Sequence, residues 1–332
     1  MNIDLKPLET ESRLLFAVPL KPLQGSRFQP TGFPNLGAAT FKTPQGESLL
    51  VESAQSMANR LELTCWDAAK NKPIGVVEGI SHVTVTRKEK FLTDSILESH
   101  RLNSPYILEG KDKTFFQKLK ADLGGLEIGP IDRSLLAKVL LKYDVGSLLH
   151  GVFFSKEELA GGRLRVARAL SAFIEADGVR VAPSGGVKND HVNPSGDSKS
   201  GFGNVPFARD EYTAEKITLY VNLDLAQIRG YGLGKEVERM LVLLAIFKVR
   251  ALLDSDLRLR TACDLVPVEP ANIAATRPKG FALPDRRQLE EELPKAIGAC
   301  QEMMQFTVVA FEDELKRSKD KGDEAEEENS EE

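Results

Sequence analysis

The chain has 332 residues, 42% hydrophobic and 28% charged, which is enough apolar material for one large domain with a sizeable core. Its cysteines, Cys65, Cys263 and Cys300, are far apart and form no Cys-x-x-Cys pair, which argues against a disulfide framework or a zinc site and favours a reducing cytoplasm. The most apolar run, Leu241 to Phe247, is too short to span a membrane, and no signal peptide is expected after Arg13.

The formal net charge of −5 is unevenly distributed along the chain. Residues 312–332 hold eleven acidic and four basic side chains, which leaves 40 basic and 38 acidic ones in 1–311. We expect 316–332 to be a disordered acidic tail, because it lacks apolar residues that could dock it. Residues 1–315 are then a single domain, and the balance over 1–311 is mildly basic, which permits nucleic-acid binding without demanding it.

In the first half of the chain, strand and helix signals alternate. Residues 14–20 are β-like and end in a loop rich in proline and glycine, 19–34. Apolar residues spaced i, i+3, i+4 and i+7 predict a helix over about 49–69, and alternation predicts a strand over 80–87. Roughly 88–145 are predicted to be mainly helical and to form an insertion.

The second half carries more strand signals, interrupted by one strongly apolar helix. The expected elements are a strand at 148–154, a long β-like stretch at 163–183, a loop at 184–207, a strand at 217–225, a helix at 236–253, a strand at 257–268, and a final helix at 288–311 interrupted by Pro294. This order is typical of an α+β protein with a mostly antiparallel sheet, and it fits an elaborated ferredoxin-like or RRM-like core.

The loop 184–207 has the clearest functional signal. It contains five glycines and two prolines, and it is longer than ordinary connections in compact domains. Lys188, Asn189 and His191 within it, and Arg209 just beyond, offer a cation, hydrogen-bonding groups and a ring for a polar, anionic ligand. A disordered crossover is the alternative, although several apolar residues could anchor the loop. The nearby Arg163 and Arg165 add positive charge, unless they are simply solvated.

Two earlier segments have a similar polar character. The first loop offers a flexible glycine beside the polar residues Gln24, Ser26, Arg27 and Gln29, which suits a phosphate, although a plain surface loop is also consistent with it. The following helix has a polar face made of Ser53, Gln55, Ser56, Asn59 and Arg60. Hydroxyls near a helix N-terminus suit an anionic ligand, and capping plus a buried polar contact is the alternative.

The sequence gives no positive sign of an enzyme, a cofactor or a metal site. Its four histidines are far apart, and no Walker, G-x-S-x-G or paired-carboxylate motif is present. His150 is interpreted as a satisfied, partly buried residue. His191 could act as a general base on a ribose hydroxyl, but as a single histidine in a polar loop it is interpreted as a binding contact.

Six blocks of sequence together resemble one known family: GSRFQPTGFP, LVESAQSMANRLE, DVGSLLHGVFF, RVARALSAFIEADGV, SGGVKNDHVNPSG with GFGNVPFARDEYTA, and ITLYVNLDLAQIRGYGLG. They resemble the backbone subunit of the type I-U (I-G) CRISPR surveillance complex, Cascade, in the "Cas seven" group of the RAMP superfamily. The resemblance runs from about Arg13 to Val268, and the acidic tail lies outside it.

This resemblance implies a modified RRM palm with an antiparallel sheet, a helical insertion and a protruding thumb at about 184–207. Copies of the chain would polymerise along one CRISPR RNA with other Cascade subunits and display the guide for pairing with target DNA. It implies contacts with the guide from Gln24, Ser26, Arg27 and Gln29, from the polar helix face, and from Lys188, Asn189 and His191 in the thumb. The aromatic signature of ordinary RRM proteins is absent, so a generic base-stacking platform is not expected.

Two other functions are compatible with the sequence. The first is an endoribonuclease of the same superfamily that processes CRISPR RNA or cuts target RNA, with Asp190 and His191 as its loop candidates. The second is a small-molecule enzyme with an active-site lid, which predicts a monomer free of nucleic acid.

Overall fold

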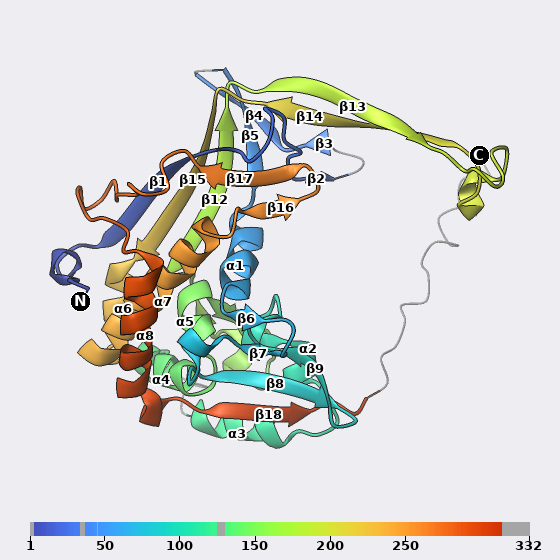
Figure 1. Cartoon of the computed structure of the whole chain (residues 1–332). Helices are drawn as coiled ribbons and strands as arrows, with labels where there is room; N and C mark the ends of the chain where they lie inside the picture. The colour runs from blue at the N-terminus through green and yellow to red at the C-terminus, as the bar shows by residue number, and fades with distance from the viewer. Residues whose placement is uncertain (1–2, 34–36, 45, 125–129, 314–332) are drawn as a thin grey trace.

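The structure is a computed structural model and describes residues 3–33, 37–44, 46–124 and 130–313. The segment predicted to be a disordered acidic tail, 316–332, lies outside the described residues. Figure 1 shows a large sheet at the top, a lobe of helices with a small sheet below it, and a long hairpin that projects from the large sheet.

A seven-stranded antiparallel sheet, here called the palm sheet, forms the upper part in the order β16-β17-β1-β15-β12-β5-β4. Its strands are β1 (Arg13–Pro22), β4 (Thr40–Thr43), β5 (Gly46–Glu52), β12 (Leu170–Asp177), β15 (Lys216–Asp224), β16 (Arg258–Arg260) and β17 (Cys263–Pro267).

Two helices complete an RRM-like core with four of these strands. The chain runs β1, α1 (Ala54–Leu63), β12, β15, α7 (Lys235–Leu253) and β17, while the sheet places the four strands in the order β17-β1-β15-β12. This is the βαββαβ connection of ferredoxin-like folds, with each helix joining two parallel strands across a third. The predicted α+β class and modified RRM-like palm are therefore confirmed.

Alternating side chains explain why the palm strands form. On β12 every second residue from Leu170 to Ala176 is buried, and β1 buries Leu14, Phe16, Val18 and Leu20 in the same way. α1 packs against β12 and α7, and α7 is buried around most of its surface. The strands predicted at 14–20 and 217–225 and the helix predicted at 236–253 are confirmed.

The helix predicted over 49–69 is wrong at both ends. Residues 46–52 form β5, Ser53 is the N-cap, and α1 ends at Leu63. Leu49 and Val51 are fully buried in β5, which pairs with β12. A short apolar run is compatible with either a helix or a strand, and pairing with a distant strand decides the outcome.

The lower lobe contains a second sheet that the sequence did not predict as a unit. Its order is β18-β8-β9, with β8 at His82–Arg87, β9 at Lys90–Asp94 and β18 at Phe306–Ala310. Helices surround it: the 3-10 helix η3 (Arg101–Asn103), α2 (Pro105–Leu108), α3 (Thr114–Asp122), α4 (Arg133–Tyr143) and α5 (Val145–His150). Within 88–145, β9 is thus a strand among helices.

Three further predicted elements differ in the structure. α8 (Arg286–Ala299) runs through Pro294 and ends before 306–310, which join β8 in parallel as β18 rather than extending the helix. The strand predicted at 148–154 is the end of α5 followed by the short β10 (Val152–Phe153), which pairs with β11 (Arg165–Val166). The strand predicted at 257–268 is the β16–β17 hairpin.

The segment 184–207 was predicted to be a loop, and most of it is one, but 184–188 and 205–207 are the ends of two paired strands. β13 (Arg180–Lys188) and β14 (Val205–Thr213) pair along their full length and continue β12 and β15 away from the palm sheet. The loop itself is only 189–204. The remaining named elements are short: β2 (Gly32–Phe33), β3 (Gly37–Ala38), β6 (Trp66–Asp67), β7 (Lys72–Pro73), α6 (Leu225–Gly230), and the 3-10 helices η1 (Lys6–Leu8), η2 (Gly75–Val77), η4 (Ala160–Gly162), η5 (Ser198–Ser200) and η6 (Gln301–Met303).

Candidate nucleic-acid interface

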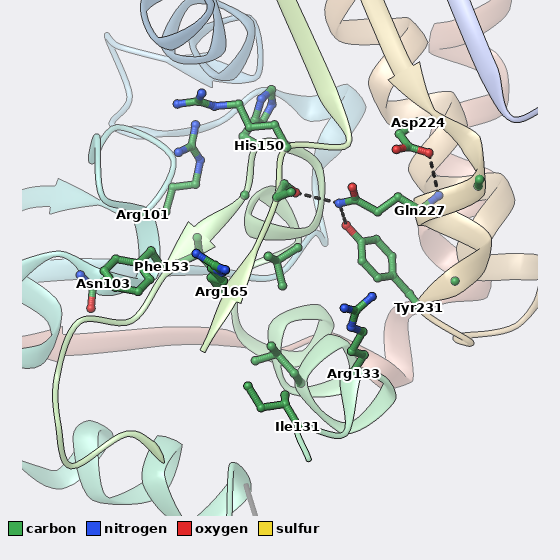
Figure 2. Close-up of a pocket in the computed structure, with 18 of the residues that line it drawn as sticks. Arg101, Asn103, Ile131, Arg133, His150, Phe153, Arg165, Asp224, Gln227 and Tyr231 are labelled. Carbon is green, nitrogen blue, oxygen red and sulfur yellow. Dashed lines mark hydrogen bonds between the residues drawn. The ribbon is translucent and has the colours of Figure 1, made fainter. Parts of the chain in front are cut away.

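A cleft of about 1800 Å³ lies between the lower edge of the palm sheet and the helical lobe. The starts of β1, α1 and α4, the end of β15 with α6, and the segments around η3 and β10–β11 all contribute side chains to it. Figure 2 shows the cleft, with Arg101, Arg133 and Arg165 among the residues that line it.

The cleft is strongly cationic, so we call it the arginine cleft. Seven arginines line it against one carboxylate, that of Asp224: Arg13, Arg101, Arg133, Arg163, Arg165, Arg168 and Arg277. Asp224 is already engaged, because it forms an ion pair with Arg13 and accepts a hydrogen bond from the backbone N–H of Gln227 as the N-cap of α6. Charge of one sign in a concave site attracts ions of the opposite sign.

Three of these arginines carry charge that the protein does not neutralise. Among the described residues, the side chains of Arg133, Arg165 and Arg168 have no hydrogen-bond or ion-pair partner, and all three are exposed. The pKa of Arg168 is lowered, because partial burial disfavours its charge and the nearby Arg101 repels it. An anion between these guanidinium groups would relieve that repulsion.

Hydrogen bonds tie the two walls of the cleft together. Gln227 Nε2 donates to the carbonyl of Ala167 at 2.7 Å and to the hydroxyl of Tyr231 at 2.7 Å. The Tyr231 hydroxyl in turn donates to the carbonyl of Leu148 at 2.7 Å, and Figure 2 shows the Gln227 side of this chain. The palm wall is thereby fixed against the segment that carries Arg165 and Arg168.

Gly151 is required for the second wall. Its φ is +79°, and a Cβ there would lie 2.7 Å from the carbonyl oxygen of Val166. The chain can therefore leave α5 and run directly against β11. This close approach places β10 and Arg165 side by side at the mouth of the cleft.

A buried polar cluster lies beneath the cleft. Lys248 Nζ on α7 is 2.9 Å from Glu62 Oε2 on α1 and 3.0 Å from His150 Nε2 on α5. Arg101 Nε lies 3.7 Å from Glu62 Oε1, so the Glu62 carboxylate forms ion pairs with both Lys248 and Arg101, which lines the cleft. Burial and the neighbouring cations lower the pKa of His150 well below its ordinary value, so the imidazole is neutral and its Nε2 can accept a hydrogen bond from Lys248 Nζ.

The sequence analysis interpreted His150 as a residue whose polar atoms are hydrogen-bonded within the protein. This holds for Nε2, which contacts Lys248, but not for Nδ1. His150 Nδ1 is buried and has no hydrogen-bond partner among the described residues, and the ring lines the cleft.

The predicted first loop lies at the base of the hairpin, not in the cleft. Phe28 of this loop exchanges two backbone hydrogen bonds with Tyr212 of β14. The guanidinium groups of Arg27 and Arg209 both meet the carboxylate of Glu211, which is only 4% exposed, and Arg27 itself remains exposed. Gln24 and Ser26 are exposed, and Gln29 accepts a hydrogen bond from Arg260 through its backbone carbonyl.

The polar face of α1 is largely used inside the protein. Ser53 caps the helix by accepting the backbone N–H of Ser56, and the Ser56 hydroxyl donates to the buried carboxylate of Glu52. Arg60 also pairs with Glu52 and donates to two backbone carbonyls of β16. The alternative of capping and buried polar contacts therefore describes these three residues. Gln55 is exposed and lines the arginine cleft, and Asn59 is half-buried.

The remaining predicted residues lie at the far end of the hairpin. Lys188, Asn189 and His191 are exposed there, and Lys188 Nζ donates to the carbonyl of Gly201. Asp190 organises the loop, because its carboxylate accepts the backbone N–H groups of Val192, Asn193 and Gly203.

Apart from Ser53, Ser56, Asn59 and Arg60 on α1, the structure separates the predicted site residues into three groups. Gln55, Arg163 and Arg165 meet in the cleft, the first loop and Arg209 meet at the hairpin base, and the thumb residues lie at its tip. Arg101 and Arg133 were missed, because they come from separate helices and no local pattern connects them.

Two negative findings concern the described residues alone. No group of three or more histidine, cysteine, aspartate or glutamate side chains within them is arranged to hold a metal ion. No helix in that part of the chain has the length and hydropathy needed to cross a membrane.

Fold and cleft together define an RRM-like protein with a cationic cleft. Residues 14–181, 168 of the 332 residues, match the family model of the CRISPR-associated protein GSU0053, so the chain belongs to this Cas7-type family of CRISPR-associated proteins. The resemblance read from the sequence motifs is thereby confirmed. The match ends early in β13, so the motifs between 182 and 268 rest on the resemblance alone.

Two solved structures are distantly similar. A chain of a CRISPR RNA-guided surveillance complex in a pre-nicking state has 17% identity and a TM-score of 0.36, with 77% of this chain and 75% of that chain covered. Csc2 from Thermofilum pendens has 7% identity and a TM-score of 0.32, with 90% and 80% covered. Likenesses this low carry no argument about function. No curated protein matches the sequence.

Proposed function

We propose that this chain is a CRISPR RNA-binding backbone subunit in antiviral defence. Copies of it would polymerise along the guide in the cytoplasm, together with other Cascade subunits, and display the guide for pairing with target DNA. The observation that carries the proposal is the arginine cleft, where seven arginines face one engaged carboxylate in a member of a CRISPR-associated family.

The cleft suits RNA backbone rather than a particular base sequence. Guanidinium groups bind phosphate through two parallel hydrogen bonds, and such contacts fix position without reading sequence. Arg133, Arg165 and Arg168 hold the charge that phosphates would neutralise. A backbone subunit needs this kind of grip, because base pairing with the guide carries the sequence information.

The hairpin fits the role of a thumb that separates guide bases. Its outer part exposes apolar side chains, among them Val192 at 96% exposure and Phe202 at 55%. Apolar side chains inserted between base steps unstack and bend nucleic acids. Gln24, Ser26, Arg27 and Arg209 at its base, and Lys188, Asn189 and His191 at its tip, would contact the strand on either side.

We further propose that the chain binds RNA without cutting it. The endoribonuclease alternative depends on Asp190 and His191. Three backbone N–H donors lower the pKa of Asp190, which makes its carboxylate a weak base. The hydrogen bonds of Asp190 give it a structural role in the loop.

The first test is the double variant Arg165→Ala/Arg168→Ala, measured by binding to a CRISPR RNA repeat–spacer transcript over a range of salt concentrations. We expect affinity to fall on the order of tenfold or more, and the slope of log K against log salt to shrink by roughly 1.4, since each lost phosphate contact on a single strand removes about 0.7. The matched control, Arg286→Ala/Arg287→Ala, removes the same charge from the start of α8, which does not line the cleft.

Equal effects of both double variants on RNA affinity would contradict a specific role for the cleft.

Incubation of the wild-type chain with the transcript, with and without magnesium, tests the enzymatic alternative. Cleavage that disappears in Asp190→Asn or His191→Ala would overturn the binding-only proposal.

A further inference from the structure

Phe153 is an exposed aromatic ring inside the arginine cleft. It belongs to β10, lines the cleft, and is 53% exposed. Its neighbours in sequence, Val152 and Phe154, are both buried. Single exposed apolar residues are common on protein surfaces, so exposure alone assigns no role to Phe153.

The position of the ring is fixed by the backbone. Phe153 is paired directly with Arg165 across the β10–β11 ribbon, and Phe154 N donates to the carbonyl of Leu164 at 2.9 Å. Buried side chains on both sides of Phe153 anchor the strand, and Gly151 holds it close to β11. The ring is thus carried by a paired strand whose backbone is fixed, and not by a loop end.

The surroundings of the ring are cationic. Figure 2 shows Phe153 between Asn103 and Arg165, with Arg101 nearby. No aromatic ring among the described residues packs against it. A flat apolar surface beside the unneutralised guanidinium group of Arg165 fits a ligand that is itself flat in one part and anionic in the next.

A nucleotide has that chemistry, and an apolar protein segment does not. A base can stack on the ring while the phosphates on either side meet the arginines. An apolar side chain from another protein would cover Phe153 but would desolvate Arg165 without neutralising it, which is unfavourable.

We propose that Phe153 is a stacking platform for one base of the RNA bound in the arginine cleft. This inference rests on the proposed RNA-binding function and adds a contact with a base to the contacts with the backbone. It also revises the expectation from the sequence that stacking is not used, because a single aromatic residue outside any known motif gives no sequence signal.

The experiment compares two single-stranded probes of equal length and charge, a uridine oligomer and the same ribose-phosphate chain without bases. The variants are Phe153→Ala, Phe153→Leu as the control that keeps apolar bulk without a ring, and Phe153→Tyr as the control that keeps the ring. We expect Phe153→Ala and Phe153→Leu to lose on the order of tenfold in affinity for the uridine oligomer, and Phe153→Tyr to recover most of it.

The same variants should bind the abasic oligomer much as the wild type does, with an equal salt slope, because stacking adds no phosphate contact. A Phe153→Trp variant adds a direct signal, since Trp66 is the only native tryptophan and is buried. Its added fluorescence should be quenched by the uridine oligomer and not by the abasic one.

Equal losses on both oligomers, or full affinity in Phe153→Ala, would overturn the stacking platform while leaving RNA binding intact. If the fluorescence of Phe153→Trp is quenched as protein concentration rises without RNA, the residue lies in a contact between copies of the chain. That result would also overturn the stacking platform. If the wild type binds neither oligomer, the proposed function itself fails.

Discussion

His150 illustrates how a single residue of this cleft is held in one protonation state. Its ring is enclosed by charged groups from four segments: Glu62 on α1, Lys248 on α7, Arg101 on η3, and Arg168 after β11. Burial, reinforced by the three cations, keeps the imidazole neutral, and the neutral ring can accept a hydrogen bond from Lys248. Protonation would place a third cation beside Lys248 and Arg101 around one carboxylate.

This state makes stability depend on pH in a definite direction. The unfolded chain takes up a proton at His150 below about pH 6.5, whereas the folded chain does not, so stability falls as pH falls. We expect the wild type to lose up to about 1.4 kcal/mol per pH unit more than His150→Gln between about pH 6 and pH 4. Denaturant unfolding at several pH values measures this difference.

The comparison with His150→Gln is needed because Asp144 changes the pH dependence of stability in the opposite direction. Burial raises its pKa to about 6, so the folded state binds this proton more tightly than the unfolded state and gains stability as pH falls. Both chains contain Asp144, so its effect cancels in the difference. If stability plotted against pH has the same slope for the two chains, His150 takes up its proton equally in the folded and unfolded states, and the prediction is wrong.

At the scale of elements, the hairpin β13–β14 is attached to the fold mainly through its base. β13 buries none of its residues, whereas Tyr212 and Glu211 at the inner end of β14 are buried against the first loop. The outer part therefore contributes little burial to the stability of the palm, which leaves it available for a ligand or a neighbouring copy.

A shortened hairpin tests this separation. Replacing residues 186–207 by Asn-Gly joins the opposed pair Gly185 and Ala208 through a two-residue turn and keeps Arg209 and Glu211. We expect the thermal midpoint to change by no more than about 5 °C, while RNA-dependent assembly is lost. Sizing chromatography with absorbance at 260 and 280 nm measures the assembly.

The matched control for the shortened hairpin changes only its charged tip, as Lys188→Ala/His191→Ala, and keeps the length. A chain with the shortened hairpin that still forms large RNA-bound particles would show that the hairpin is not the thumb. A collapse of the thermal midpoint would show that it is part of the palm core.

Sequence patterns predicted the elements whose pattern is complete within one segment. β1 and β15 alternate locally, so alternation was sufficient for them, and α7, which is buried around most of its surface, was identified by the length of its apolar run. β5 and β18 were mistaken for helix because their apolar runs carry no clear period. β5 is a strand through pairing with the adjacent β4 and with the distant β12, and β18 is a strand through pairing with the distant β8. Tertiary pairing outweighs local propensity at such positions.

At the scale of the whole molecule, the arginine cleft arises only when distant segments are brought together. Arg13 starts β1, Arg133 starts α4, and Arg165 lies on β11, so more than thirty residues separate each from the next. No sequence window contains them, which explains why the sequence indicated polar loops and not the cleft. Arg163 and Arg165 were recognised because they lie two residues apart in one segment with a β-like sequence, although only Arg165 lies on β11.

The last prediction concerns the charge of the chain as a whole. Residues 314–332 contain nine acidic and four basic side chains, so they account for the entire net charge of −5, and the rest of the chain has equal numbers of acidic and basic residues. A net negative charge repels RNA before contact, and salt screens this repulsion. We expect a chain ending at Asp313 to bind a CRISPR RNA transcript several-fold more tightly than the full chain at about 0.05 M salt.

The advantage of the shortened chain should disappear near about 1 M salt, where charges more than roughly 3 Å apart are screened. A chain in which 314–332 are replaced by a glycine–serine segment of equal length is the matched control, and it should bind like the shortened chain if charge is the cause. Tighter binding by the shortened chain alone would indicate that the length of the segment obstructs RNA. Binding curves for all three chains at both salt concentrations separate these causes, because only the electrostatic effect depends on both charge and salt.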